Sequence, residues 1–134
     1  SLADRFAEAF AEYLHECIRE ECGFPDSKTF TKLDLIKERY RGIRPAPGYA
    51  ACPDHSDKRL IFSLLDVENS TTMTLTDSYA VMPASSVVGF YFNHPKSRYF
   101  SVGRVGKDQM TSLARRKGIS VEECERWMAA NLGY

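Results

Sequence analysis

The sequence predicts an α+β fold, an antiparallel sheet with helices packed around it, in a single domain that spans residues 1–134. Near both ends of the chain, apolar residues recur at steps of three and four, which is the period of amphipathic helices. Between these regions lie short segments rich in β-branched and aromatic residues, separated by turn residues, which is typical of strands. No Gly-x-Gly-x-x-Gly turn follows a strand and the βαβ alternation is missing, so a Rossmann fold is not expected.

The first expected element is a long amphipathic helix over residues 2–22. Its apolar residues form one stripe, which should face the core, and glutamates occupy much of the remaining surface. Gly23 and Pro25 should end the helix, because glycine is favoured after the last turn and proline cannot continue it. The stripe consists of Leu2, Phe6, Ala9, Phe10, Tyr13, Leu14 and Cys17.

A short helix and an irregular segment are expected next. Thr31 and Asp34 have the spacing of a capping box, so a helix should begin there and end at Gly42. Residues 41–53 contain three prolines and two glycines, a composition that excludes both a helix and a central strand. We therefore expect a stiff, irregular segment after the short helix, whose apolar face consists of Leu35, Ile36 and Tyr40.

The middle of the chain is predicted to hold one further helix, over residues 57–68, and then the sheet. The run at 87–92 is apolar on both faces, which is typical of a central strand covered on both sides. Residues 93–97 should turn this strand back on the one at 99–102 as a hairpin. The helix should point Leu60, Ile61, Leu64 and Leu65 inward, and the strands are expected at 73–76, 79–82, 86–93 and 99–102.

Two helices, at residues 108–117 and 120–130, are expected to complete the chain. Three basic residues end the first of them, where they suit the negative end of the helix dipole, and Gly118 follows as the C-cap. A capping box of Ser120 and Glu123 opens the second. This last helix should bury Val121, Cys124, Trp127 and Met128.

The composition excludes several classes of function. Eighteen basic and eighteen acidic residues cancel, so we expect no binding to nucleic acid or to an anionic membrane. The four cysteines form no Cys-x-x-Cys pair and the three histidines have no ligand spacing, which favours free thiols and no metal site. The chain begins at Ser1 within a helical pattern and shows no signal-peptide pattern, so we expect a cytoplasmic protein and a fragment of a longer chain.

The segment Arg44-Pro45-Ala46-Pro47-Gly48-Tyr49 is the most informative stretch for function. An arginine at the edge of a rigid loop offers a planar fork to a carboxylate or a phosphate. Gly48 lets a ligand approach the backbone, and Tyr49 offers an aromatic face with a polar tip. A structural interpretation stands beside this one, in which Arg44 caps the preceding helix and the prolines only shape a connection. The segment alone leaves both open.

This segment resembles the Arg-x-x-x-Gly-Tyr motif of the activation (reactivation) domain of cobalamin-dependent methionine synthase, and the residues around it resemble the same family. The similarity runs in one order along the whole chain, from the long helix at residues 2–15 to the last four residues, Asn131-Leu132-Gly133-Tyr134. This is far more specific than one short motif, and it favours a ligand-binding role for Arg44. Further matching stretches are Cys52-Pro53-Asp54-His55, Val88-Gly89-Phe90-Tyr91-Phe92 and His94-Pro95-Lys96-Ser97-Arg98-Tyr99-Phe100.

The resemblance implies part of the activation-domain fold and a domain that binds S-adenosylmethionine and supports reductive methylation of oxidised cobalamin. The implied partners are the cobalamin-binding domain of the same enzyme and a flavodoxin-type or flavoprotein reductant. In the family, an aspartate upstream of the matched region also contacts S-adenosylmethionine. The chain would thus be the C-terminal portion of the domain, belonging to a methyltransferase but not active alone. The residues suggest no protein nucleophile, and we expect none to be catalytic.

The resemblance also assigns roles to residues at the cofactor's amino-acid end. Arg44 would bind the carboxylate of the methionine moiety. Ala46, Gly48 and Tyr49 would line the pocket through their backbone and the tyrosine ring. Tyr49 would also face the upper side of the cobalamin.

Further roles follow for residues outside this loop. Tyr99 and Phe100 would contact the adenosine. Glu8 and Glu38 would lie near the cationic sulfonium, where negative charge is favourable. Because glutamates are common on helix surfaces, the interpretation of both as ordinary solvated acids stands equally beside this one. Asp4 would contact the cobalamin module.

Two alternatives to this function remain at the level of sequence. A non-catalytic module of the same fold would only dock onto a corrinoid-binding domain, and measurable S-adenosylmethionine binding would separate it from the main interpretation. An unrelated α+β ligand-binding domain would carry the motif by chance, and an adjacent cobalamin-binding segment would exclude it.

Overall fold

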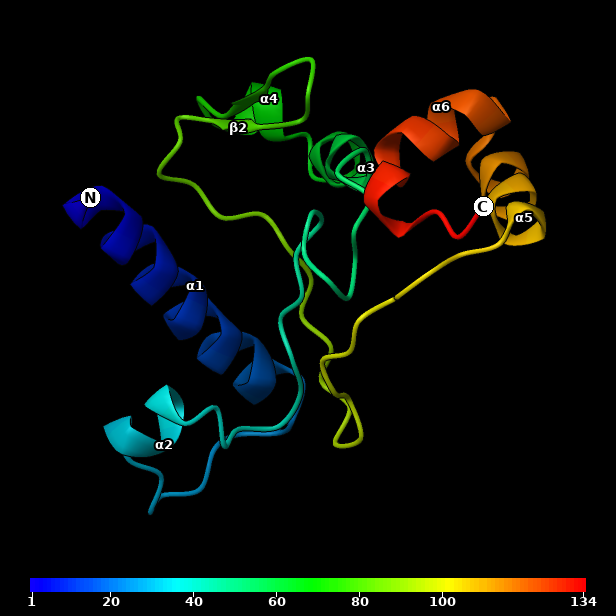
Figure 1. Ribbon diagram of the computed structural model, residues 1–134. Helices are drawn as coiled ribbons and strands as arrows, with labels where there is room; N and C mark the ends of the chain where they lie inside the picture. The colour runs from blue at the N-terminus through cyan, green and yellow to red at the C-terminus, as the bar shows by residue number, and fades with distance from the viewer.

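The computed structural model describes residues 1–134 and combines helices with a small antiparallel sheet, which confirms the predicted α+β class. Figure 1 shows α1 and α2 on one side of the molecule and α5 and α6 on the other, joined by long irregular segments. The elements in chain order are α1 (Leu2–Glu21), α2 (Lys32–Ile36), α3 (Asp57–Leu64), α4 (Val67–Ser70), β1 (Thr74–Leu75), β2 (Val81–Met82), α5 (Lys107–Lys117), α6 (Val121–Trp127) and a 3-10 turn (Ala129–Asn131).

Helix α1 forms as predicted, but it buries a different face. Ser1 and Asp4 close a capping box at its start. The residues that it buries are Ala11, His15 and Arg19, at four-residue steps. The expectation that the apolar stripe faces the core of this chain was wrong, because most of its side chains are exposed: Leu2, Phe6, Phe10, Tyr13 and Leu14.

The predicted helix over residues 57–68 is divided into α3 and α4. Asp66 has a φ of 49° in the left-handed region, which interrupts the helical hydrogen-bond ladder between them. The inward face was also predicted wrongly. Phe62 is the buried residue of α3, whereas the side chains of Leu60, Leu64 and Leu65 are exposed.

The sheet is smaller than the sequence predicted. Strands β1 and β2 pair antiparallel, with Thr74 opposite Met82. The expected central strand at 86–93 and its hairpin with 99–102 do not form, because both segments bond instead to the proline-rich segment, residues 41–53. Phe90 and Phe92 pair with Pro45 and Ile43, and Val102 donates to Ala50. Ile43 and Phe92 exchange both backbone hydrogen bonds, but Pro45 has no N–H to donate to Phe90, so this pairing stays short.

The main hydrophobic core lies between α5 and α6, and of the four residues that the last helix was expected to bury, Cys124 and Met128 are buried while Val121 and Trp127 are partly buried. Met110 and Ala114 of α5 contact Cys124 and Met128 at the other helix, and all four are buried. Lys117 at the end of α5 forms ion pairs with Asp54 and Asp57, which tie this pair of helices to the start of α3. None of the helices has the length and apolar character needed to cross a bilayer.

Candidate functional site

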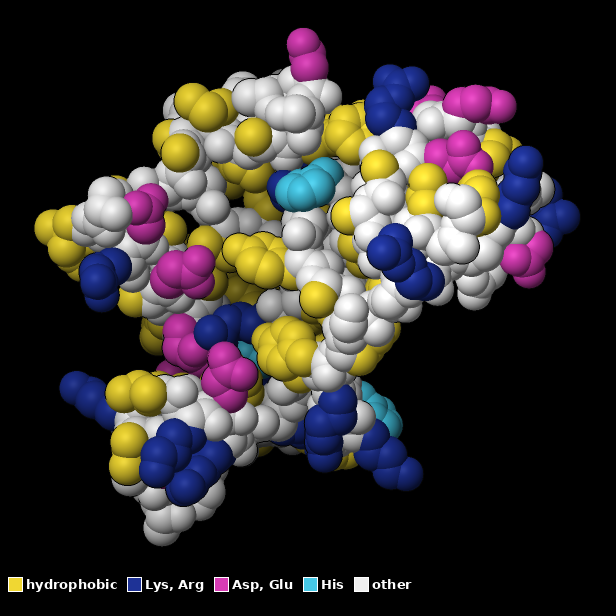
Figure 2. Space-filling model, in the orientation of Figure 1, with side chains coloured by type: hydrophobic (Ala, Val, Ile, Leu, Met, Phe, Trp, Pro, Cys, Tyr) yellow, Lys and Arg dark blue, Asp and Glu magenta, His cyan; other side chains and the backbone are white.

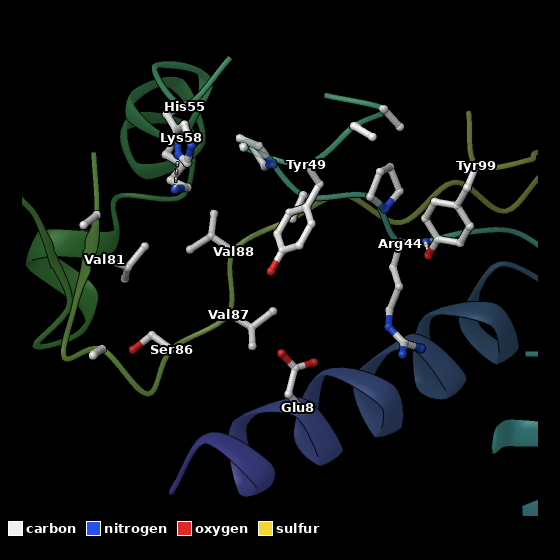
Figure 3. A pocket seen from close by; sticks show the side chains of 18 of the residues that line it. Glu8, Arg44, Tyr49, His55, Lys58, Val81, Ser86, Val87, Val88 and Tyr99 are labelled. Atoms are coloured by element: carbon white, nitrogen blue, oxygen red, sulfur yellow. Dashed lines mark hydrogen bonds between the residues drawn. The ribbon is translucent and has the colours of Figure 1, made fainter. Parts of the chain in front are cut away.

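A cavity of about 850 Å³ lies between α1, the proline-rich segment and the chain that leads from β2 to residue 88. Its lining is mainly hydrophobic, with 11 of 19 residues of that type, and a few polar groups converge on it. Such a combination is typical of small-molecule sites. Figure 2 shows this face hollowed, with hydrophobic side chains in the hollow and acidic and basic side chains side by side at its edge. Figure 3 shows the lining from close by.

The proline-rich segment forms a fixed wall of the cavity. Gly42, with a φ of 89°, allows the segment to lie against Phe92, whose carbonyl oxygen would be 2.2 Å from a Cβ at this position. Pro47 is fully buried, and the amide of Gly48 donates to the carbonyl of Cys52 at 2.7 Å. Backbone hydrogen bonds between Ile43 and Phe92 therefore hold the beginning of the segment, and the bond from Gly48 to Cys52 closes a turn within it, although the segment belongs to no regular element.

Arg44 reaches from this wall to α1. Its backbone N–H donates to the hydroxyl of Tyr99 at 3.0 Å, and its Nη1 donates to the hydroxyl of Tyr40 at 2.7 Å. The same Nη1 forms an ion pair with Glu12 of α1 at 2.5 Å. Burial disfavours the charge of Arg44, but Tyr40 and Glu12 outweigh this effect and raise its pKa above the ordinary value. The guanidinium is thus a permanent, half-buried cation at the cavity.

A buried cluster of His15, Tyr40 and Tyr91 contacts Arg44 through the hydroxyl of Tyr40. Tyr40 is buried, with the guanidinium of Arg19 4.4 Å from its ring centroid and the His15 ring 5.0 Å away, edge on. His15 stacks on Tyr91 at 4.8 Å. Burial raises the pKa of Tyr40 to about 12 despite the opposing charge of Arg44, so its hydroxyl stays protonated.

The cavity brings together seven residues that the sequence predicted for the site. Figure 3 shows Glu8 pointing from α1 toward the cavity, across from Tyr49, whose side chain is 71% exposed. Tyr99 lies beside Arg44 and contacts its backbone. The seven lining residues are Glu8, Arg44, Ala46, Gly48, Tyr49, Tyr99 and Phe100.

Two of the predicted residues lie outside the cavity. Glu38 is exposed just after α2 and does not line it. Asp4 caps α1 and accepts hydrogen bonds from Ser1 and, at 2.8 Å, from the hydroxyl of Ser85. In this structure Asp4 therefore ties the start of α1 to the chain after β2.

Several lining residues were missed by the sequence interpretation. His55 packs against Gly48, and Lys58 lies 3.0 Å from the Nδ1 of His55 and donates to the carbonyl of Tyr79. Residues 86–88 were read as strand, although they form part of the wall. Glu12, which pairs with Arg44 but does not line the cavity, was also missed, and its only signal was that it follows Glu8 by four residues and so shares its helix face.

The side chains and backbone groups at the cavity are of kinds that bind a ligand. No serine or cysteine beside a base lines it, in contrast to sites built for nucleophilic attack. No three His, Cys, Asp or Glu side chains gather closely enough to hold a metal ion. What the cavity offers is a cation, an acid across from Tyr49, aromatic rings and backbone groups, which suits a ligand with both apolar and zwitterionic parts.

Known proteins similar to this chain share one description. The family model for the activation domain of vitamin B12 dependent methionine synthase matches residues 1–118. A solved structure, the MetH reactivation domain bound to AdoHcy, matches with a TM-score of 0.93 and 54% sequence identity. This match covers 98% of the present chain but 41% of the solved one, so the chain spans less than half the length of that relative.

Proposed function

Because the chain belongs to the activation-domain family of vitamin B12 dependent methionine synthase, we propose that its cavity binds S-adenosylmethionine. In this role the chain supports the reductive methylation of oxidised cobalamin in the same enzyme. The relative with 54% identity was solved with AdoHcy, the molecule left when S-adenosylmethionine has lost its methyl group, and this supports the ligand class.

Arg44 is the observation that carries the proposal. Its guanidinium lines the cavity and is charged at every physiological pH, while its Nε and Nη2 groups make no hydrogen bond within the chain. A guanidinium edge of this kind matches the two oxygens of a carboxylate. The α-carboxylate of the methionine moiety fits this role, and the rest of the molecule then extends along the cavity.

The other lining residues suit the remaining parts of S-adenosylmethionine. Tyr99 and Phe100 supply rings for the adenosine, and the backbone of Ala46 and Gly48 forms the wall beside the amino-acid end. Glu8 supplies negative charge for the sulfonium. Glu38 lies outside the cavity, so we infer that it acts only through the general field or not at all.

The cobalamin belongs to a different domain of the enzyme in this proposal. S-adenosylmethionine supplies an electrophilic methyl group when bound, and the residues of this chain bind and orient it. Tyr49 is highly exposed, which suits a side chain that faces the cobalamin module, and we infer that Asp4, in the first turn of α1, contacts the same module. We also infer a flavodoxin-type or flavoprotein reductant and a cytoplasmic location, with no activity of the chain on its own.

Calorimetric titration with S-adenosylmethionine tests the proposal, with Arg44→Lys as the decisive variant. A lysine cannot form the bidentate fork, so we expect affinity to fall about tenfold or more, because one hydrogen bond to a charged group is worth about 1.5–3 kcal/mol. Arg39→Lys is the matched control, since Arg39 is exposed and pairs with Asp34 away from the cavity. Equal losses in both variants, or no binding by the unaltered protein, would overturn the proposal.

A further inference from the structure

The hydrogen bond and the ion pair of the Arg44 guanidinium are both made through one of its nitrogens. Nη1 donates to Tyr40 and forms the ion pair with Glu12, while Nε and Nη2 have no partner. From this arrangement we infer that Glu12 is a positioning residue, which holds Arg44 so that its Nε–Nη2 edge is presented to the α-carboxylate of an amino-acid-bearing ligand. This inference rests on the proposed function and assigns a residue that the family motif does not include.

Glu12 is suited to this role because its carboxylate pairs with Arg44 and with no other cation. Arg44 is the only partner in its ion pair, and its other oxygen, Oε1, is buried without a hydrogen bond. Both side chains are largely shielded, with 21% of Arg44 and 23% of Glu12 exposed, so water screens their attraction less than at the surface. Glu12 does not line the cavity, so it stands behind the arginine rather than beside the ligand.

Glu8 and Glu12 lie on one face of α1 but have different roles. They are four residues apart, which places them one above the other on the helix. Glu8 lines the cavity and makes no ion pair within the chain, whereas Glu12 is the acid paired with Arg44. The helix thereby offers one free acid to the cavity and one acid that fixes the cation.

Tyr40 provides the second point of attachment. Its hydroxyl accepts from Nη1 at 2.7 Å, and its ring is held by His15 and Arg19 in the buried cluster. A free arginine side chain samples many rotamers, and fixing it on binding would weaken the affinity. Two anchors on the same nitrogen remove much of this loss before the ligand arrives, and they leave the opposite edge open.

Ligands with and without a carboxylate distinguish positioning from a general structural role. S-adenosylmethionine and AdoHcy carry the α-carboxylate, whereas 5′-methylthioadenosine has the same nucleoside and sulfur without the amino-acid tail. We expect Glu12→Gln to weaken the first two about tenfold and to change the affinity for 5′-methylthioadenosine less than about twofold. Glu16→Gln, on the same helix but exposed, should change neither affinity.

Calorimetry with these three ligands on the unaltered protein, Glu12→Gln and Glu16→Gln decides the matter. Tyr40→Phe removes the other anchor and should give the same selective loss, which provides a second variant if Glu12→Gln folds poorly. Unchanged or tighter S-adenosylmethionine binding by Glu12→Gln would show that Glu12 merely competes with the ligand, and equal losses for all three ligands would show a structural role. Either result overturns this inference while the proposed function stands, whereas no binding by the unaltered protein overturns both.

Discussion

His15 is the residue whose surroundings are most unusual for its type. It is fully buried on α1 between Tyr40 and Tyr91, and neither ring nitrogen has a hydrogen-bond partner. Burial and, to a lesser degree, the charges of Arg19 and Arg44 lower its pKa to about 4. A protonated His15 would place a third cation in the cluster that holds Arg44, so the neutral ring is part of the support for the site.

This burial predicts a specific loss of stability in mild acid. Between pH 6.5 and about 4 the unfolded chain binds a proton at His15 and the folded chain does not, so stability is fully present above pH 6.5 and falls as the pH falls through this window. The total loss is of the order of 3 kcal/mol. Urea unfolding at several pH values should show the decline.

The variant His15→Phe should flatten the dependence in this window, because phenylalanine keeps the ring stacking and cannot titrate. Asp54 contributes with the same sign only at lower pH, since hydrogen bonds from Lys117 and Ser56 outweigh its burial and lower its pKa below 3.8. A pH profile of His15→Phe parallel to that of the unaltered protein would contradict this assignment.

At the scale of elements, the segment at residues 41–53 governs both the site and the failed strand predictions. Its prolines and glycines predicted a stiff, irregular segment, and the structure has such a segment as a wall of the cavity. The partner of that wall could not be predicted from sequence, because an extended apolar run such as 87–92 satisfies its backbone equally well against a strand or against a loop. The positions of the helices were predictable, since their caps and periods are local, but the break at Asp66 and the early end of α2 at Ile36 were not.

Burial of the helix faces was predictable only where the partner lay nearby in sequence. The apolar positions of α6 pack against α5, and both helices are adjacent along the chain. The apolar stripe of α1 has no such neighbour. Glu12 of the same helix pairs with Arg44, which lies 32 positions further along the sequence. Seven lining residues of the cavity were identified through the family resemblance, whereas ion pairs and packing across the cavity needed the structure.

Gly48 offers a test of how rigid this wall must be. It has a φ of 102°, and a Cβ there would lie 2.2 Å from Cε1 of His55. Gly48→Ala therefore combines backbone strain with a clash, and we expect a loss of about 1–3 kcal/mol in the free energy of unfolding together with weaker S-adenosylmethionine binding. Urea unfolding and calorimetry measure the two effects.

Gly103→Ala separates the strain from the clash. Gly103 also has a positive φ, of 68°, but no atom lies within 4 Å of a Cβ placed there. The Gly103→Ala variant should lose stability through backbone strain alone and keep its affinity for S-adenosylmethionine. If both alanine variants bound S-adenosylmethionine normally, the close packing of Gly48 on His55 would have no part in shaping the cavity.

For the whole molecule, the balance between buried and exposed apolar surface is unusual. Only 12 of 134 residues are buried, and the α5–α6 cluster contains four of them. Meanwhile Phe6 and Phe10 of α1 are 67% and 62% exposed. Because apolar residues at four-residue steps form a continuous stripe, this is a patch rather than scattered single side chains. The chain thus presents a hydrophobic helix face that its own residues leave open.

This open face predicts the behaviour of the 134-residue chain in isolation. An extended apolar patch binds hydrophobic dyes and favours self-association, since burial of apolar surface is worth about 25 cal/mol per Å². The double variant Phe6→Gln/Phe10→Gln, which keeps good helix formers, should bind less 8-anilinonaphthalene-1-sulfonate and sediment at a lower average mass. Ile36→Gln is the control, because Ile36 is 78% exposed on α2 and away from the stripe. If Ile36→Gln lowered dye binding and average mass as much as the double variant, or if neither variant changed them, the α1 stripe would not determine how the isolated chain associates.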